Sequence, residues 1–302
     1  MKSDLSPKVK GQLKALLEGF PITGNYLLRR YLKKHSKVEM ELIEGKYQNY
    51  SNHPSVIHFS VNKAATQYVR ELLSRCAAEN GMTPVGLAEY AFHTKFPYLD
   101  QLSDREMVQY QYLFNPVGYL YSVFGGMVEG IPELEKYRVI LMIRDPRDVL
   151  VSEYYSYAFS HSEPSRLGDK YADFMRMRQK ARTITIDEYV VSECDRVCVN
   201  YERYVSLLLD RYAHVLVTKY EEMTSDFEAW LKKILEHCEF KISDRLLESI
   251  LNEAGHLKPK QEDIHQHIRK GMPGDYKEKL DRKTIDCIDA KFSSMLERFD
   301  YK

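Results

Sequence analysis

An unbroken apolar run at residues 139–143 constrains the fold more than any other feature of the chain. Its sequence is Val-Ile-Leu-Met-Ile, which is typical of a strand buried on both faces of a parallel sheet. Asp145-Pro146 then predicts a sharp turn, because proline disfavours helical backbone at the residue before it and has a φ suited to a first helical turn. From Arg147 onward, apolar residues recur at helical spacing. The segment therefore predicts strand, tight turn and helix, with Arg144 at the carboxyl end of a central strand.

Arg144 and Ser152 are the first candidate ligand-binding pair. They are eight residues apart, which places Ser152 about two turns into the predicted helix. Open α/β sheets bind ligands at the carboxyl ends of their strands, and a guanidinium with a hydroxyl beside a helix start suits phosphate. The alternative is that Arg144 forms a structural ion pair with Asp145 or Asp148.

A second stretch has the order of a phosphate-binding loop. Lys63 and Thr66 stand between a predicted strand at residues 55–60 and a predicted helix, so backbone N–H groups and the helix start can face an anion. The two glycines of a Walker motif are absent. A surface lysine at a helix start is the alternative explanation of this stretch alone.

A third stretch, residues 269–276, combines Arg269 and Lys270 with Gly271, Gly274 and a proline. Two cations beside backbone that can adopt positive φ predict a second anion clamp, with a simple surface turn as the alternative.

The order of the remaining segments predicts an α/β fold: a single domain with a central parallel sheet flanked by helices. Strands are predicted at 55–60, 87–93, 117–124, 139–143 and 214–220, alternating with helices. Ser225 and Glu228 predict a capping box before a helix of clear 3.6-residue period. Residues 1–50 are predicted to be a helical preamble, with helices over 7–18 and about 22–36, and residues 51–302 to be the main domain.

Composition narrows the partners and the compartment. Lys+Arg and Asp+Glu both number 44 among 302 residues, which argues against a nucleic-acid binder. Bases concentrate in residues 1–37, where a solvated helix face is favoured over peripheral membrane contact. No apolar run is long enough to span a bilayer, and no signal peptide opens the chain. The five cysteines are predicted to be reduced thiols in a cytoplasmic protein, with Cys194 and Cys198 on one helix face.

In order along the chain, these stretches resemble the motifs of sulfotransferases that use 3′-phosphoadenosine 5′-phosphosulfate (PAPS). Residues 62–68 occupy the place of P-K-S-G-T-T-W, 144–152 match R-D-P-R-D-V-x-x-S, 220–223 are similar to Y-E-D-L, and 269–277 match R-K-G-x-x-G-D-W-K. The resemblance implies the P-loop-NTPase-like sulfotransferase fold. It also implies transfer of a sulfuryl group from PAPS to a hydroxyl or amine, with 3′,5′-adenosine bisphosphate (PAP) as the other product and no metal required.

The resemblance also implies roles for single residues. Lys63 and Thr66 would hold the 5′-phosphosulfate end, with backbone N–H groups from Ala64 and Ala65, whereas Gln67 stands where the family has a hydroxyl. Ser152 would bind the 3′-phosphate together with Arg144, Arg269, Lys270 and Gly271. Tyr68 and Tyr220 would flank the adenine. Ala65 replaces the family's loop glycine, which leaves the loop geometry open.

Catalysis requires a cation at the leaving oxygen and a base for the acceptor proton. Lys63 suits the first role. The histidine that many family members carry before the second motif is absent from residues 119–124. Some glycan-modifying members use instead a glutamate after the phosphosulfate helix, and this resemblance makes Glu89 and His93 candidate bases. His161 is a third candidate, because it shares a predicted helix face with Tyr154 and Tyr157.

The acceptor is open between a small molecule, a glycan and a lipid. The tyrosines around the presumed cleft favour an apolar or sugar-like face: Tyr119, Tyr121, Tyr154, Tyr155 and Tyr157. The sequence leaves O- versus N-sulfation and the oligomeric state open. Two alternative functions are a nucleotide-dependent kinase of related fold and a non-catalytic nucleotide-binding scaffold.

Overall fold

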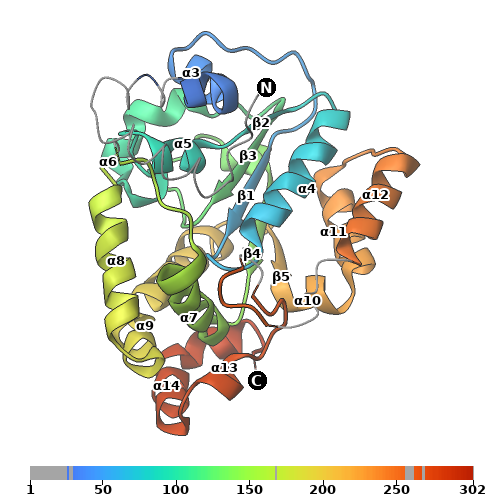
Figure 1. The fold of residues 1–302 in the computed structure, drawn as a ribbon. Helices are drawn as coiled ribbons and strands as arrows, with labels where there is room; N and C mark the ends of the chain where they lie inside the picture. The colour runs from blue at the N-terminus through green and yellow to red at the C-terminus, as the bar shows by residue number, and fades with distance from the viewer. Residues whose placement is uncertain (1–25, 27–29, 167–168, 256–261, 267–268, 302) are drawn as a thin grey trace, which may run out of the picture.

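A five-stranded parallel sheet lies at the centre of the protein (Figure 1). The computed structural model describes residues 26, 30–166, 169–255, 262–266 and 269–301. The strand order is β2-β3-β1-β4-β5, and the strands are β1 Val56–Ser60, β2 Thr83–Val85, β3 Tyr119–Phe124, β4 Arg138–Ile143 and β5 Leu216–Lys219. The prediction of an α/β fold with a parallel sheet is therefore confirmed.

Helices cover the sheet and connect its strands. Those of the main domain are α4 Thr66–Glu79, α5 Leu87–His93, α6 Asp104–Met107, α7 Pro146–Tyr155, α8 Tyr171–Thr183, α9 Ile186–Tyr204, α10 Tyr220–Ser225, α11 Phe227–Cys238, α12 Asp244–Ala254, α13 Tyr276–Lys279 and α14 Arg282–Arg298. Helices α4, α11 and α12 lie together, and α7, α9 and α14 form a second packed group. The short helix α3, Lys37–Ile43, precedes β1.

The apolar run at residues 139–143 forms a fully buried stretch of the central strand β4. Residues 139–143 of β4 all have 0% exposure, because β1 and β5 pair with both edges of β4 and helices cover the faces. Asp145 caps α7 by accepting the Arg147 N–H, and Pro146 occupies the first turn. The predicted strand, turn and helix are thus confirmed at the point where the sheet meets the candidate site.

Two predictions about local structure are wrong. Residues 87–93 form the helix α5 and not a strand, because the buried Leu87 and Ala91 are four residues apart, as in a helix. The helix after residue 225 starts one residue later than predicted: Asp226 is its N-cap and accepts the Ala229 N–H at 3.0 Å, whereas Ser225 is the last residue of α10.

The N-terminal predictions are only partly covered by the structure. The helix predicted over 7–18 lies outside the described residues, as does most of the one over 22–36, of which 30–35 are helical. The domain boundary at residue 50 stays a prediction. Within the described ranges, no helix is long and apolar enough to cross a membrane. All five cysteines are free, and Cys194 and Cys198 share a buried face of α9.

Candidate active site

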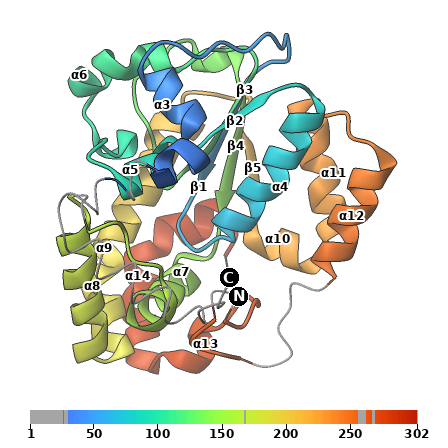
Figure 2. The same cartoon turned by 45° about the horizontal axis from the view of Figure 1, so that its top comes forward.

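One cavity of about 1250 Å³ lies where β1 and β4 end. Figure 2 shows both strands running toward the loop before α4, the start of α7 and the segment that leads to α13. The cavity is lined by Lys63, Ala65, Thr66, Gln67, Tyr68, Glu89, His93, Arg144, Ser152, His161, Tyr220, Arg269, Lys270 and Gly271. Of the site residues proposed from the sequence, only Ala64 is absent from the lining, since its side chain is fully buried.

The loop from β1 to α4 leaves the helix start available to an anion. Its first residue, Val61, donates its N–H to the Met142 carbonyl at 2.9 Å, which fixes the loop to β4. Ala65 is the N-cap of α4 and provides no side-chain cap, so first-turn N–H groups lack their usual internal partner. An anion at this end is favoured by those N–H groups and by the helix dipole.

The missing loop glycine does not prevent the left-handed backbone that a glycine would favour. Ala65 has φ 56° and Lys63 has φ 66°. Side chains with a Cβ adopt this region at a cost of roughly 1–2 kcal/mol per residue. The loop therefore has backbone strain at two of its residues, Lys63 and Ala65.

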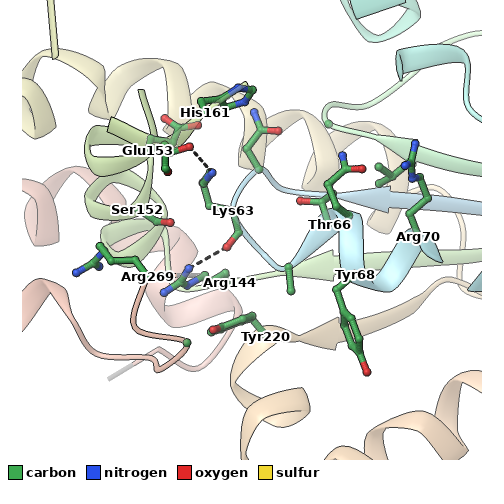
Figure 3. A pocket seen from close by; sticks show the side chains of 18 of the residues that line it. Lys63, Thr66, Tyr68, Arg70, Arg144, Ser152, Glu153, His161, Tyr220 and Arg269 are labelled. Carbon is green, nitrogen blue, oxygen red and sulfur yellow. Dashed lines mark hydrogen bonds between the residues drawn. The ribbon is translucent and has the colours of Figure 1, made fainter. Parts of the chain in front are cut away.

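Lys63 points across the cavity toward α7 (Figure 3). Its Nζ donates a hydrogen bond to Ser156 Oγ at 2.8 Å, one helical turn beyond Ser152. Burial lowers the pKa of Lys63 to about 8, and the nearby Glu153 carboxylate opposes this shift while Arg144 adds to it. An ammonium that is poorly solvated in the empty cavity gains from an anionic partner.

Arg144 is held firmly but keeps unused hydrogen-bonding capacity. It is 6% exposed, donates from NH1 to the Lys63 carbonyl at 2.8 Å, and stacks over the Tyr220 ring at 4.3 Å. The predicted alternative, an ion pair with Asp148, is also present at 3.7 Å, whereas Asp145 binds Arg147. Arg144 Nε is buried without a partner among the described residues. A buried unpaired donor is rare.

The third segment brings two more cations to the cavity. Arg269 stacks over the Tyr155 ring at 4.3 Å, and Gly271 has φ 67°, a conformation that suits glycine. Arg269 and Lys270 both bind the carboxylate of Asp275, which has 1% side-chain exposure. This segment therefore faces the other two anion-binding segments, and Asp275 holds both of its cations.

Two aromatic side chains flank the part of the cavity below the β1–α4 loop, where Figure 3 shows Tyr68 and Tyr220. Tyr68 also contacts Phe227 of α11, with ring centroids 6.2 Å apart. Phe227 lines the cavity, and the sequence analysis did not select it because helical periodicity gave it a core role. Flat aromatic walls suit a planar base.

The three candidate bases all line the cavity but have different partners. Glu89 forms an ion pair with Arg70, and a proton on that carboxylate would weaken the pair. The His93 ring lies against Tyr31 and Phe92. His161 stacks on Tyr157 at 5.6 Å.

The His161 ring nitrogens can be told apart from the structure. Its Nδ1 is 2.8 Å from the Ser162 carbonyl. Because a carbonyl only accepts, Nδ1 is the donor and Nε2 is the basic nitrogen of the neutral ring.

The structure adds residues that the sequence analysis missed. Glu153 is 2% exposed, lines the cavity and binds Arg196. Asp100 and Tyr98 also line it, and burial raises the pKa of Asp100. The position of Glu153, directly after Ser152, was the available signal. Asp100 and Tyr98 belong to an irregular segment without a periodic pattern.

The predicted ring of tyrosines is partly wrong. Tyr155 and Tyr157 line the cavity, but Tyr119 and Tyr121 are 3% and 0% exposed in β3, where they stack on each other in the core. Tyr154 packs against Tyr189 outside the lining. The prediction failed because both faces of β3 are covered, so the side chains on either face of this strand are buried.

Several solved structures are similar to this chain. Solved structures with similar folds include mouse sulfotransferase SULT7A1 complexed with PAP, at 18% identity and TM-score 0.47, covering 85% of this chain and 89% of that one. Retinol dehydratase in a complex with retinol and PAP is 16% identical with TM-score 0.44, covering 81% and 82%. Sulfotransferase STF9 from Mycobacterium avium is 10% identical with TM-score 0.47, covering 91% and 82%.

No curated protein matches the sequence. The family model described as "Sulfotransferase domain" matches residues 54–300, which is most of the chain. The chain therefore belongs to the sulfotransferase family, as its motifs predicted.

Proposed function

We propose that this sulfotransferase uses PAPS as its donor and sulfates a hydroxyl or amine of a small-molecule, glycan or lipid acceptor. The observation that carries the proposal is the convergence of three anion-binding segments, residues 61–66, 144–152 and 269–271, on one cavity. A nucleotide with phosphate groups at both its 3′ and 5′ positions needs such separate clamps. When bound, PAPS supplies an activated sulfuryl group, and its nucleotide product is PAP.

The 3′-phosphate is assigned to the cations Arg144, Arg269 and Lys270, with Ser152 and the Gly271 backbone. Arg144 lines the cavity, and its planar guanidinium suits the oxygens of a phosphate, which supports this assignment. The adenine is assigned to the space beside Tyr68 of α4 and Tyr220 of α10, which both line the cavity.

The 5′ end is assigned to the start of α4, with Thr66 and Gln67 in its first turn and the Ala64 and Ala65 backbone beside it. Lys63 is the cation for the leaving oxygen. Its amine already crosses the cavity to Ser156, and a pKa of about 8 lets it exist in charged form at neutral pH while remaining poorly solvated. The chain therefore provides positive charge where negative charge would develop.

The acceptor proton requires a base within the same cavity. We assign it to one of the two histidines, His93 or His161, since protonation of Glu89 would weaken its ion pair with Arg70. A histidine titrates near neutral pH and is suited to the task without a large pKa shift.

The cavity has room for both substrates. Its volume of about 1250 Å³ exceeds the roughly 300–1000 Å³ of an ordinary ligand pocket. Beyond the donor clamps its wall includes Phe92, Tyr98 and Tyr157, which supports an acceptor with an apolar or sugar-like face.

The direct test compares PAP with AMP in thermal unfolding. At a hundredfold excess over Kd a ligand stabilises the folded protein by about 2.7 kcal/mol. PAP should raise Tm at concentrations where AMP does not, since only PAP has the 3′-phosphate. Equal shifts with both nucleotides would refute the 3′-phosphate assignment.

A turnover comparison separates the alternative functions. Transfer from PAPS to an acceptor panel supports the proposal. Phosphoryl transfer from ATP would instead favour a kinase, and nucleotide binding without either transfer would favour a scaffold.

A further inference from the structure

A buried carboxylate connects two of the three anion-binding segments. Asp148, in the first turn of α7, has 0% side-chain exposure and is four residues beyond Arg144. Its Oδ2 accepts the Gly274 N–H at 2.6 Å, and its Oδ1 accepts the Tyr276 N–H at 3.0 Å. The same carboxylate is 3.7 Å from the Arg144 guanidinium.

Both carboxylate oxygens of Asp148 therefore bind the segment that carries Arg269 and Lys270. Gly274 and Tyr276 lie just beyond those cations, and Asp275 between them binds both cations. The chain of contacts therefore runs from Arg144 through Asp148 to the loop backbone, and through Asp275 to Arg269 and Lys270.

The neighbouring Arg147 fixes the outer side of the same segment. Its guanidinium binds Asp145 and Asp289 of α14 and stacks over the Tyr276 ring at 4.2 Å. Tyr276 is therefore held by its backbone through Asp148 and by its ring through Arg147. This leaves the loop few ways to move relative to α7.

An ionised carboxylate in so buried a place is costly unless it is well paired. Burial raises the pKa of Asp148, and Arg144 and the two backbone N–H groups oppose that shift. A purely apolar contact could join a loop to a helix at lower cost. What the carboxylate adds is a fixed distance between the guanidinium of Arg144 and the loop.

We propose that Asp148 is the positioning residue that sets the spacing between the Arg144 clamp and the Arg269–Gly271 clamp, and thereby the preference for a nucleotide with a 3′-phosphate. The inference rests on the proposed function, since it assigns both clamps to that phosphate. Asp148 itself does not contact the nucleotide; it acts through the Gly274 and Tyr276 backbone and through Arg144.

The test measures the Kd values of PAP and AMP by calorimetry for the full chain and for Asp148→Asn. The variant keeps the volume but replaces one acceptor oxygen by an amide donor and removes the charge that faces Arg144. We expect the PAP-to-AMP preference to fall about tenfold to hundredfold, the range for lost hydrogen bonds to charged groups. AMP affinity should change little, because AMP lacks the phosphate that the spacing serves.

Gly274→Ala approaches the same spacing from the loop side without touching a buried charge. Gly274 has φ 83° and open space around an added Cβ, so the substitution strains the backbone and produces no clash. It should lower the PAP-to-AMP preference in the same direction, and it keeps the test decisive if Asp148→Asn does not fold.

Glu39→Gln is the matched control. Glu39 is a buried carboxylate that accepts the Gly86 N–H at 2.7 Å. It belongs to α3, which lies at the opposite end of the molecule from α13 (Figure 1). It should change stability without changing the PAP-to-AMP ratio.

The outcomes are distinguishable. No preference for PAP in the unmodified protein would refute the donor site itself. A clear preference that survives in a folded Asp148→Asn, or in Gly274→Ala when the first variant does not fold, would refute the positioning role. A fall in the ratio for Glu39→Gln as large as for Asp148→Asn would also refute it, by showing that any lost carboxylate has this effect.

Discussion

Replacing Lys63 by methionine should make the empty protein more stable and the enzyme inactive. Burial lowers the pKa of Lys63 from 10.5 to about 8, and at 1.36 kcal/mol per pKa unit this corresponds to about 3 kcal/mol against the charged amine. The side chain keeps some exposure to the cavity, so this is an upper limit. Methionine has a similar length and no charge, and removing the penalty should raise Tm by roughly 3–5 °C for a chain of this size.

The stability difference between Lys63→Met and the unmodified protein should depend on pH. Below pH 8 the amine is charged in both the folded and the unfolded protein, so the full penalty is present. As pH rises from 8 toward 10.5, the folded protein loses its proton first and the penalty disappears. The stability difference between Lys63→Met and the unmodified protein should therefore be largest near pH 7 and shrink above pH 8.

Differential scanning fluorimetry between pH 6.5 and 9.5, without nucleotide, measures this difference. Lys170→Met is the control, because Lys170 is paired with Asp169 and donates to the Phe96 carbonyl at 2.9 Å; its loss should lower Tm. A Lys63→Met protein that is less stable than the unmodified chain, or a difference independent of pH, would refute the reasoning. Sulfate transfer by Lys63→Met should fall by about a hundredfold or more.

Three further predictions follow from single residues of the cavity. Ala65→Gly should be neutral or stabilise by up to about 1 kcal/mol in urea unfolding, because relief of the left-handed strain exceeds the added chain entropy; a loss of stability would show that the methyl packing matters more. Arg144→Lys should weaken PAP binding by about tenfold to hundredfold through loss of the guanidinium fork and leave AMP nearly unchanged, as measured by calorimetry; an equal loss for both nucleotides would contradict a 3′-specific role. Among His93→Asn, His161→Asn and Glu89→Gln, only the variant of the base should lower kcat by about a hundredfold or more without changing PAP affinity, and three mild effects would place the base elsewhere.

The residues of the proposed donor site could be placed around one cavity from the sequence because they belong to regular transitions. Arg144 follows a strand whose five apolar residues fix both its burial and its end, and Lys63 and Thr66 stand between another strand and a long helix. Each position follows from a periodic segment and a turn residue such as Pro146. Parallel strands then bring their carboxyl ends to one edge of the sheet.

The rest of the cavity lining was not predictable in the same way. Asp100 and Tyr98 belong to short turns of irregular structure, and the helix α5 with Glu89 and His93 was expected to be a strand. A short, largely apolar segment of seven residues fits either type, and only its contacts decide. The tyrosines of β3 were misplaced for a related reason, since a strand covered on both faces hides residues that alternation alone would expose.

The two cations of the C-terminal loop are already matched by carboxylates before any nucleotide is present. Asp275 pairs with both Arg269 and Lys270, Glu262 pairs with Arg269, and Glu278 pairs with Lys270. A phosphate that binds here therefore replaces these carboxylates as the partner of the cations. When it leaves, the carboxylates can pair with the cations again. Such an exchange makes product escape easier than a cluster of unmatched cations would, and PAP affinity measured between 50 and 300 mM salt should fall more steeply in Glu262→Gln than in the unmodified enzyme.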